Sequence, residues 1–148
     1  MPTLAVRNDV TFYYTDSGAP GDRTFQRLAP HAASRGVRII SLNRQEYPGS
    51  TPYSEEERRI LLHGDETDME RFLHQQGLLI ALFIDGLLQE HSLPKRVAVA
   101  GWSLGNTFSI ALLATIDEMP EGIKERLTNS IDHFFFWGTY SHLGEALF

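Results

Sequence analysis

The stretch that decides the fold of this chain is Val97–Leu113, which reads VAVAGWSLGNTFSIALL. Its first four residues, Val97–Ala100, are all apolar, and every second one is a β-branched valine. This pattern is typical of a strand buried on both faces of a parallel sheet. An apolar helix is predicted to follow at once. Between them lies Gly101-x-Ser103-x-Gly105, whose small residues allow a sharp turn that presents the Ser103 hydroxyl at the end of the strand. The turn also leaves the Leu104 N–H at a helix start, where it can stabilise an oxyanion.

Set between a strand and an apolar helix, Gly101-Trp102-Ser103-Leu104-Gly105 resembles the nucleophile elbow of the α/β-hydrolase superfamily, in particular its esterase and haloperoxidase-like branch. The resemblance implies a mostly parallel sheet with helices on both faces. It also implies that Ser103 is the nucleophile, that Leu104 supplies a backbone oxyanion donor, and that Gly101 and Gly105 are the elbow glycines. A tight structural turn in another doubly wound fold is the alternative interpretation.

The composition narrows the class of protein. The 148 residues, 42% of them apolar, suffice for one compact domain, so a single domain over residues 1–148 is expected. A net charge of −6 without a basic stripe argues against nucleic acid as a partner. The absence of cysteine excludes disulfides and thiolate metal sites, and the six histidines show no metal-binding spacing. Neither a metal nor another cofactor is expected.

No targeting or membrane-spanning segment is evident in the sequence. Met1–Val10 has no apolar core of signal-peptide length. The longest apolar run, Gly77–Leu88, covers 12 residues and contains Asp85, so it is too short to span a bilayer. A soluble, cytoplasmic protein is the expectation.

Apolar periodicity and turn residues predict several further elements. These are a strand at Val10–Tyr14, a helix from Thr24 to about Ser34 that stops at Gly36, a strand at Val37–Leu42, a short helix that opens at Ser54, a long helix capped by Asp68 and reaching about His91, a short helix at Ile123–Leu127 and a last strand at Ile131–Trp137.

The resemblance covers nearly the whole chain, but of a protein that lacks one central strand and the C-terminal strands. The family's central strand ends in a His-Gly pair, and Ser17–Thr24 leaves no room for it, so the second oxyanion donor has no counterpart. The strands at Val37 and Val97 would flank the gap, and they must pair directly or leave open edges. Open edges, together with the aromatic run Phe134–Trp137, predict self-association.

A serine nucleophile needs a histidine base, which in turn is oriented by a carboxylate. In the family both follow the serine, but only 45 residues (148 minus 103) follow Ser103. Asp132 and His133 start the last strand, roughly 15 Å from the edge where Ser103 lies. Three other side chains can reach that edge: His63 and His142 are the candidate bases, and Asp65 is the candidate acid.

Further residues are assigned to a substrate pocket. Arg44 and Tyr47 lie in the loop after the Val37 strand, which resembles an arginine-bearing turn of the family, and Trp102 neighbours the serine. A loop held only by its own hydrogen bonds is an equal alternative for Arg44 and Tyr47.

The sequence therefore predicts a serine hydrolase that acts on a small-molecule ester or similar acyl substrate. Because the acid, the histidine and the His-Gly loop are missing, this chain is expected to be weakly active or inactive. The alternative is a non-catalytic binding or interaction module of the same fold.

Overall fold

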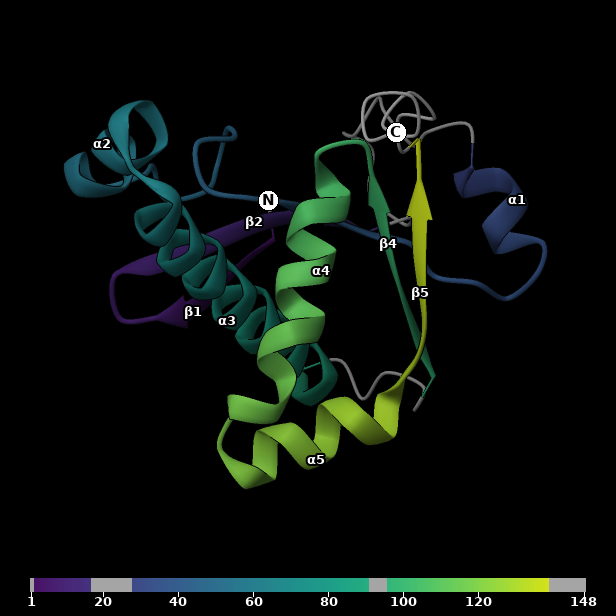
Figure 1. The fold of residues 1–148 in the computed structure, drawn as a ribbon. Coiled ribbons are helices and arrows are strands. Elements are labelled where there is room, and N and C mark those ends of the chain that lie inside the picture. The colour runs from purple at the N-terminus through teal and green to yellow at the C-terminus, as the bar shows by residue number, and fades with distance from the viewer. Residues whose placement is uncertain (1, 17–27, 91–95, 139–148) are drawn as a thin grey trace, which may run out of the picture. The chain divides into compact units, whose positions relative to one another are not determined.

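The computed structural model describes residues 2–16, 28–90 and 96–138. The chain forms two compact units, Met1–Glu55 and Glu56–Phe148, which are described separately below. Figure 1 shows their elements in chain order. Some sequence-based predictions fall outside the described residues, namely the Ser17–Thr24 gap, the helix start at Thr24, the helix end at His91 and the base candidate His142. The single domain expected over residues 1–148 stays a prediction.

The first unit is built on an antiparallel sheet of three strands, in the order β1 (Thr3–Arg7), β2 (Val10–Asp16) and β3 (Ile40–Asn43). Strand β2 alternates, with Val10, Phe12 and Tyr14 buried, because successive side chains of a strand point to opposite faces. Short helix α1 (Ala29–Ala33) precedes Gly36, whose φ of 66° is the left-handed conformation expected at a helix stop.

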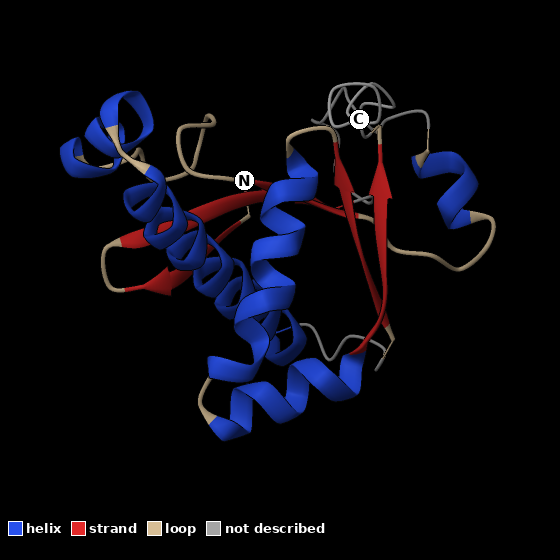
Figure 2. Cartoon of the chain, in the orientation of Figure 1, coloured by secondary structure: helices blue, strands red, loops and turns tan. Residues whose placement is uncertain are grey.

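The second unit combines helices with a parallel pair of strands. Helices α2 (Glu55–His63) and α3 (Glu66–Glu90) lead into strand β4 (Val97–Trp102). Helix α4 (Gly105–Thr115), the 3₁₀ turn η1 (Ile116–Glu118) and helix α5 (Glu121–Ser130) then lead into strand β5 (Ile131–Trp137). Helix α4 packs against α3 and against both strands, and Figure 2 shows it running back alongside the parallel pair.

The core of the second unit lies mainly between α3 and α4. Gly77 is the point of closest approach, because a Cβ atom built there would lie 2.4 Å from the carbonyl oxygen of Ala111. Buried side chains surround this crossing, among them Phe72, Leu79, Ile80, Phe83, Phe108 and Leu112.

Among the described residues the strands form two sheets, an antiparallel one in the first unit and a parallel one in the second. The expected single, mostly parallel sheet and the expected pairing or open edges of the strands at Val37 and Val97 stay predictions. The general α/β class holds, with both helices and strands in a mixed arrangement.

The prediction that β4 is buried on both faces is wrong in the part of the chain that the structure describes. Val99 is half-buried, whereas Ala98, Ala100 and Trp102 are exposed. Helix α4 covers one face of the strand, and the apolar run alone could not show whether anything covered the other.

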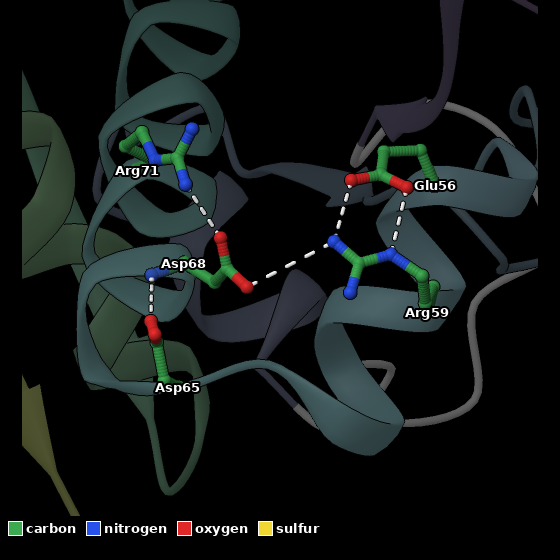
Figure 3. A network of polar contacts seen from close by, with 5 residues as sticks. All are labelled: Glu56, Arg59, Asp65, Asp68 and Arg71. Atoms are coloured by element: carbon green, nitrogen blue, oxygen red, sulfur yellow. Dashed lines mark hydrogen bonds and ion pairs between the residues drawn. The ribbon is translucent and has the colours of Figure 1, made fainter.

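The long helix α3 is capped by Asp65, which corrects the prediction that Asp68 is the cap. The helix begins at Glu66, and the Asp65 carboxylate accepts a hydrogen bond of 2.9 Å from the Asp68 backbone N–H. Asp68 is instead the third helical residue, and its carboxylate pairs with Arg71 at 2.5 Å and Arg59 at 3.8 Å (Figure 3). Glu56 completes this network of five polar side chains: its carboxylate accepts a 2.7 Å hydrogen bond from Arg59, and this hydrogen bond lowers the pKa of Glu56.

Two arginine–aspartate pairs with the same Nε–Oδ distance of 2.6 Å differ in burial. The side chain of Asp85, paired with Arg126, is 6% exposed, and Asp132, paired with Arg96, is 34% exposed. Arg126→Ala leaves a buried carboxylate without its cation, whereas Arg96→Ala leaves one that water can reach. We expect Arg126→Ala to lower the melting temperature clearly and Arg96→Ala to leave it nearly unchanged. Equal melting temperatures for the two variants would contradict the burial of Asp85.

Within the described ranges, no helix is both long enough and apolar enough to cross a membrane.

Candidate functional site

Ser103 lies on a sharp turn between β4 and α4. Its φ of 53° is in the left-handed region, which costs a residue other than glycine about 1–2 kcal/mol. The Ser103 N–H donates a 2.9 Å hydrogen bond to the carbonyl oxygen of Trp137, the last residue of β5. The residue itself is exposed. A strained backbone of this kind persists only where the surroundings hold it, and such positions cluster at functional sites.

Two glycines leave the space that the turn needs. A Cβ atom at Gly101 would lie 2.8 Å from both Asn106 Oδ1 and Ser109 Oγ, so only glycine fits beneath α4. Gly138, with φ 67°, lets the chain pass close to Trp102, since a Cβ there would lie 2.8 Å from the indole nitrogen. Gly105 meets no atom within 4 Å, so its small size is not required by its neighbours among the described residues.

The start of α4 presents a backbone donor next to the serine. Asn106 N–H donates to Ser103 O at 3.0 Å, and Thr107 N–H donates to Leu104 O at 3.2 Å. The Leu104 N–H makes no hydrogen bond within the described part of the chain, as expected for the first residues of a helix. One donor is therefore in place for a negative charge that develops beside Ser103.

No base for Ser103 is found in residues 2–16, 28–90 and 96–138. No histidine in these ranges forms a hydrogen bond with its hydroxyl. His63 ends α2, which Figure 1 shows on the far side of α4 from the end of β4. Asp65 uses its carboxylate as the cap of α3. The remaining candidate, His142, is not among the described residues.

Two other histidines, His74 and His133, have contacts of their own. His74 forms a 2.8 Å hydrogen bond with Glu118, and the ring of His133 stacks on Phe135 with 6.0 Å between centroids. No cluster of three or more metal-binding side chains occurs among the residues that the structure describes.

The predicted pocket residues fall in different units. Arg44 and Tyr47 belong to the first unit, where the guanidinium carbon lies 5.4 Å from the centre of the Tyr47 ring, a cation–π contact. Trp102 belongs to the second unit and is 57% exposed next to Ser103.

The loop that carries Arg44 and Tyr47 is held to β2 by hydrogen bonds. Thr51 and Thr11 are joined by two bonds of 2.9 Å, and the Ser50 hydroxyl accepts from Tyr13 N–H at 2.8 Å. The same hydroxyl donates to Asn43 O at 2.6 Å. These contacts agree with the alternative of a loop held by its own hydrogen bonds, and the pocket role stays a prediction.

The sequence-based reasoning missed one residue at the elbow. Asn106 is 5% exposed, and its side-chain amide binds both backbone polar groups of Trp137. The available signal was its position three residues after the serine, in the first turn of the helix, where a buried amide needs partners.

The geometry thus defines a strand–turn–helix elbow with an exposed serine and one backbone donor beside it. Comparison of the chain with models of protein families, with curated proteins and with solved structures found no match.

The strain at Ser103 can be measured by substitution. Ser103→Gly is expected to stabilise the protein by about 0.5–1 kcal/mol, because relief of the left-handed strain exceeds the added chain entropy of the unfolded state. Ala114→Gly, at an exposed position of α4, is the matched control and is expected to cost about 1 kcal/mol. Urea unfolding measures both. A loss of stability for Ser103→Gly equal to that of the control would place Ser103 in an ordinary helical or extended conformation.

Proposed function

We propose that the chain is a serine hydrolase-like protein of the α/β-hydrolase type, with Ser103 in the nucleophile position for an ester or similar acyl bond. The observation that carries the proposal is the left-handed φ of Ser103, 53°, in an exposed turn between a parallel strand and a helix. A nucleophile elbow requires this combination, because the strain pushes the hydroxyl out at the end of the sheet.

The chemistry follows from the groups beside the serine. The Ser103 oxygen attacks the carbonyl carbon of the acyl group, and the Leu104 N–H donates a hydrogen bond to the oxyanion that forms. Because the described residues supply no base, the hydroxyl proton passes to solvent water, and the oxyanion then collapses to the acyl-enzyme as the alkoxide leaves and takes a proton from water. Loss of the triad partners costs about 10⁶-fold in kcat, so we propose that this chain by itself is weakly active or inactive.

Hydrolysis of short p-nitrophenyl esters tests the proposal. Wild type and Ser103→Ala are compared, with Ser109→Ala, at a serine of α4 that is 7% exposed, as the control. We expect slow hydrolysis that Ser103→Ala lowers and Ser109→Ala leaves unchanged, because only Ser103 lies beside the Leu104 N–H. A rate that does not depend on Ser103 would refute the assignment of the nucleophile.

A second function is favoured by the open face of the β4–β5 pair. Trp102, Phe135 and Trp137 are 57%, 55% and 73% exposed. Trp102 lies opposite Trp137 in the register, and Ala100 lies opposite Phe135, so these side chains share one face. Within the described residues each strand pairs only with the other, which leaves edges able to accept another strand.

The partner we propose for this face is a second copy of the chain. Residues His133–Trp137 of β5 contain no acidic or lysine side chain, and the Asp132 carboxylate that precedes them is paired with Arg96, so this part of β5 in two copies can lie side by side with little like-charge repulsion. Cross-strand aromatic pairs contribute about 0.2–1 kcal/mol each. In this function the parallel pair is an interaction surface, and no turnover is needed.

Light scattering after size-exclusion chromatography tests self-association. We expect the mass to rise with concentration for wild type and to stay monomeric for Phe135→Lys, because a lysine on an edge strand opposes pairing. Leu113→Lys, at a position of α4 that is 52% exposed, is the control and should behave like wild type. A wild-type protein that stays monomeric at all concentrations would exclude this function.

A further inference from the structure

We propose that Asn106 is a positioning residue for Ser103: its buried amide ties the elbow to the end of β5 and so holds the serine in its strained conformation. This inference rests on the proposed function for the role of Ser103 as nucleophile. The geometry of the elbow itself does not depend on that function.

The Asn106 side chain is the central link. It is 5% exposed, its Nδ2 donates to the Trp137 carbonyl oxygen at 3.1 Å, and its Oδ1 accepts from the Trp137 N–H at 3.3 Å. A buried amide that uses both its donor and its acceptor on one residue fixes that residue in orientation as well as in distance. The start of α4 is thereby joined to the last residue of β5.

Ser103 shares the same acceptor. Its N–H donates to the Trp137 carbonyl oxygen at 2.9 Å, and its own carbonyl oxygen accepts from the Asn106 N–H at 3.0 Å. Ser103, Asn106 and Trp137 therefore form a closed ring of hydrogen bonds. Such a ring restricts the backbone on both sides of the serine, which is what a left-handed residue other than glycine requires.

Gly101 leaves the space that the Asn106 side-chain amide occupies. A Cβ atom at Gly101 would lie 2.8 Å from Asn106 Oδ1 and 2.9 Å from its Cα. The absence of a side chain at Gly101 is therefore what lets the amide reach Trp137. Ser109, which lies as close to Gly101, donates instead to the Gly105 carbonyl oxygen within its own helix at 3.2 Å. Ser109 is thus a matched control, since it is buried and polar but takes no part in the ring.

Amide hydrogen exchange, followed residue by residue by NMR, tests the inference. In Asn106→Ala we expect the Ser103 and Trp137 amides to exchange at least about tenfold faster, because the ring is opened and local opening becomes easier. The Val99 amide, in the middle of β4, should keep its wild-type rate. Ser109→Ala should leave the Ser103 and Trp137 rates unchanged.

A second variant guards against a general loss of structure. Asn106→Asp keeps an acceptor for the Trp137 N–H but removes the donor to its carbonyl oxygen, so it should also speed exchange at Ser103. The stabilisation expected from Ser103→Gly should shrink when it is combined with Asn106→Ala, since a relaxed elbow no longer imposes the strained φ. A purely structural Asn106 would lower stability without this coupling.

The outcomes separate the two proposals. Unchanged Ser103 exchange in both Asn106 variants, or equal Ser103→Gly effects with and without Asn106, would overturn the positioning role whatever the reactivity of Ser103. If the Asn106 variants exchange faster at Ser103 but ester hydrolysis by the wild type does not depend on Ser103, the positioning role of Asn106 is supported and the hydrolase proposal is refuted.

Discussion

Gly77→Ala is expected to destabilise the second unit by about 2–3 kcal/mol, although alanine is the better helix former. The added Cβ would lie 2.4 Å from the Ala111 carbonyl oxygen, 2.7 Å from its carbon and 2.8 Å from the Thr115 hydroxyl. Two of these three atoms belong to the backbone of α4, which cannot move aside as a flexible side chain can. The two helices must therefore separate, and packing along their contact is lost.

The control for this prediction is Gly122→Ala in α5. Gly122 is exposed, and the nearest atom to an added Cβ is the end of the flexible Arg126 side chain at 3.6 Å. Here the helix propensity of alanine should prevail, and we expect no loss of stability or a gain of up to about 1 kcal/mol. Urea unfolding followed by circular dichroism compares both variants with wild type. A Gly77→Ala protein as stable as Gly122→Ala would show that α3 and α4 do not approach each other so closely.

Leu112→Ala is expected to cost about 3–5 kcal/mol, the range for a large-to-small change in a core that cannot collapse. Leu112 is fully buried in α4, the helix that carries the serine elbow at its start. The loss combines the removed apolar surface with the cavity that remains.

Leu113, the next residue, is the matched control because it is 52% exposed. Leu113→Ala should change stability by less than about 0.5 kcal/mol. The same unfolding measurement serves for both variants. A larger loss for Leu113→Ala than for Leu112→Ala would mean that α4 presents its other face to the core.

The elbow could be predicted from the sequence because its cause is local. A strand, a turn with glycine at position 101 and an apolar helix occupy seventeen consecutive residues, Val97–Leu113, and the structure places the serine in a left-handed turn there. The strand Ile131–Trp137 was also predicted with its observed bounds, because its aromatic and branched residues favour extended backbone.

Strand β1 was missed because it is short and polar at both ends. It pairs with β2 through the turn at Asn8 and Asp9, which lacks the glycine of the usual hairpin signals, and Arg7 forms a 2.7 Å ion pair with Asp9. The exposure of Ala98 and Ala100 could not be predicted either, because a continuous apolar run has the same sequence pattern whether one face of the strand or both faces are covered.

The residues that hold the serine in place were harder to predict, because their partners are distant in the sequence. Asn106 bonds a residue 31 positions later, and no local pattern contains that information. Asp65 and Asp68 both lie near the start of α3, and composition cannot tell which of the two is the cap. The candidate acid Asp65 thereby has a structural role that spacing alone did not indicate.

Ser103 is an exposed elbow serine for which the described residues supply no base. The most direct test of this proposal is the rate at which a fluorophosphonate probe labels Ser103, located by mass spectrometry and compared with Ser103→Ala. We expect slow labelling, on the order of 10⁶-fold below that of a complete triad. Rapid stoichiometric labelling that disappears in Ser103→Ala would contradict it, because the proton of the hydroxyl would then have found a base.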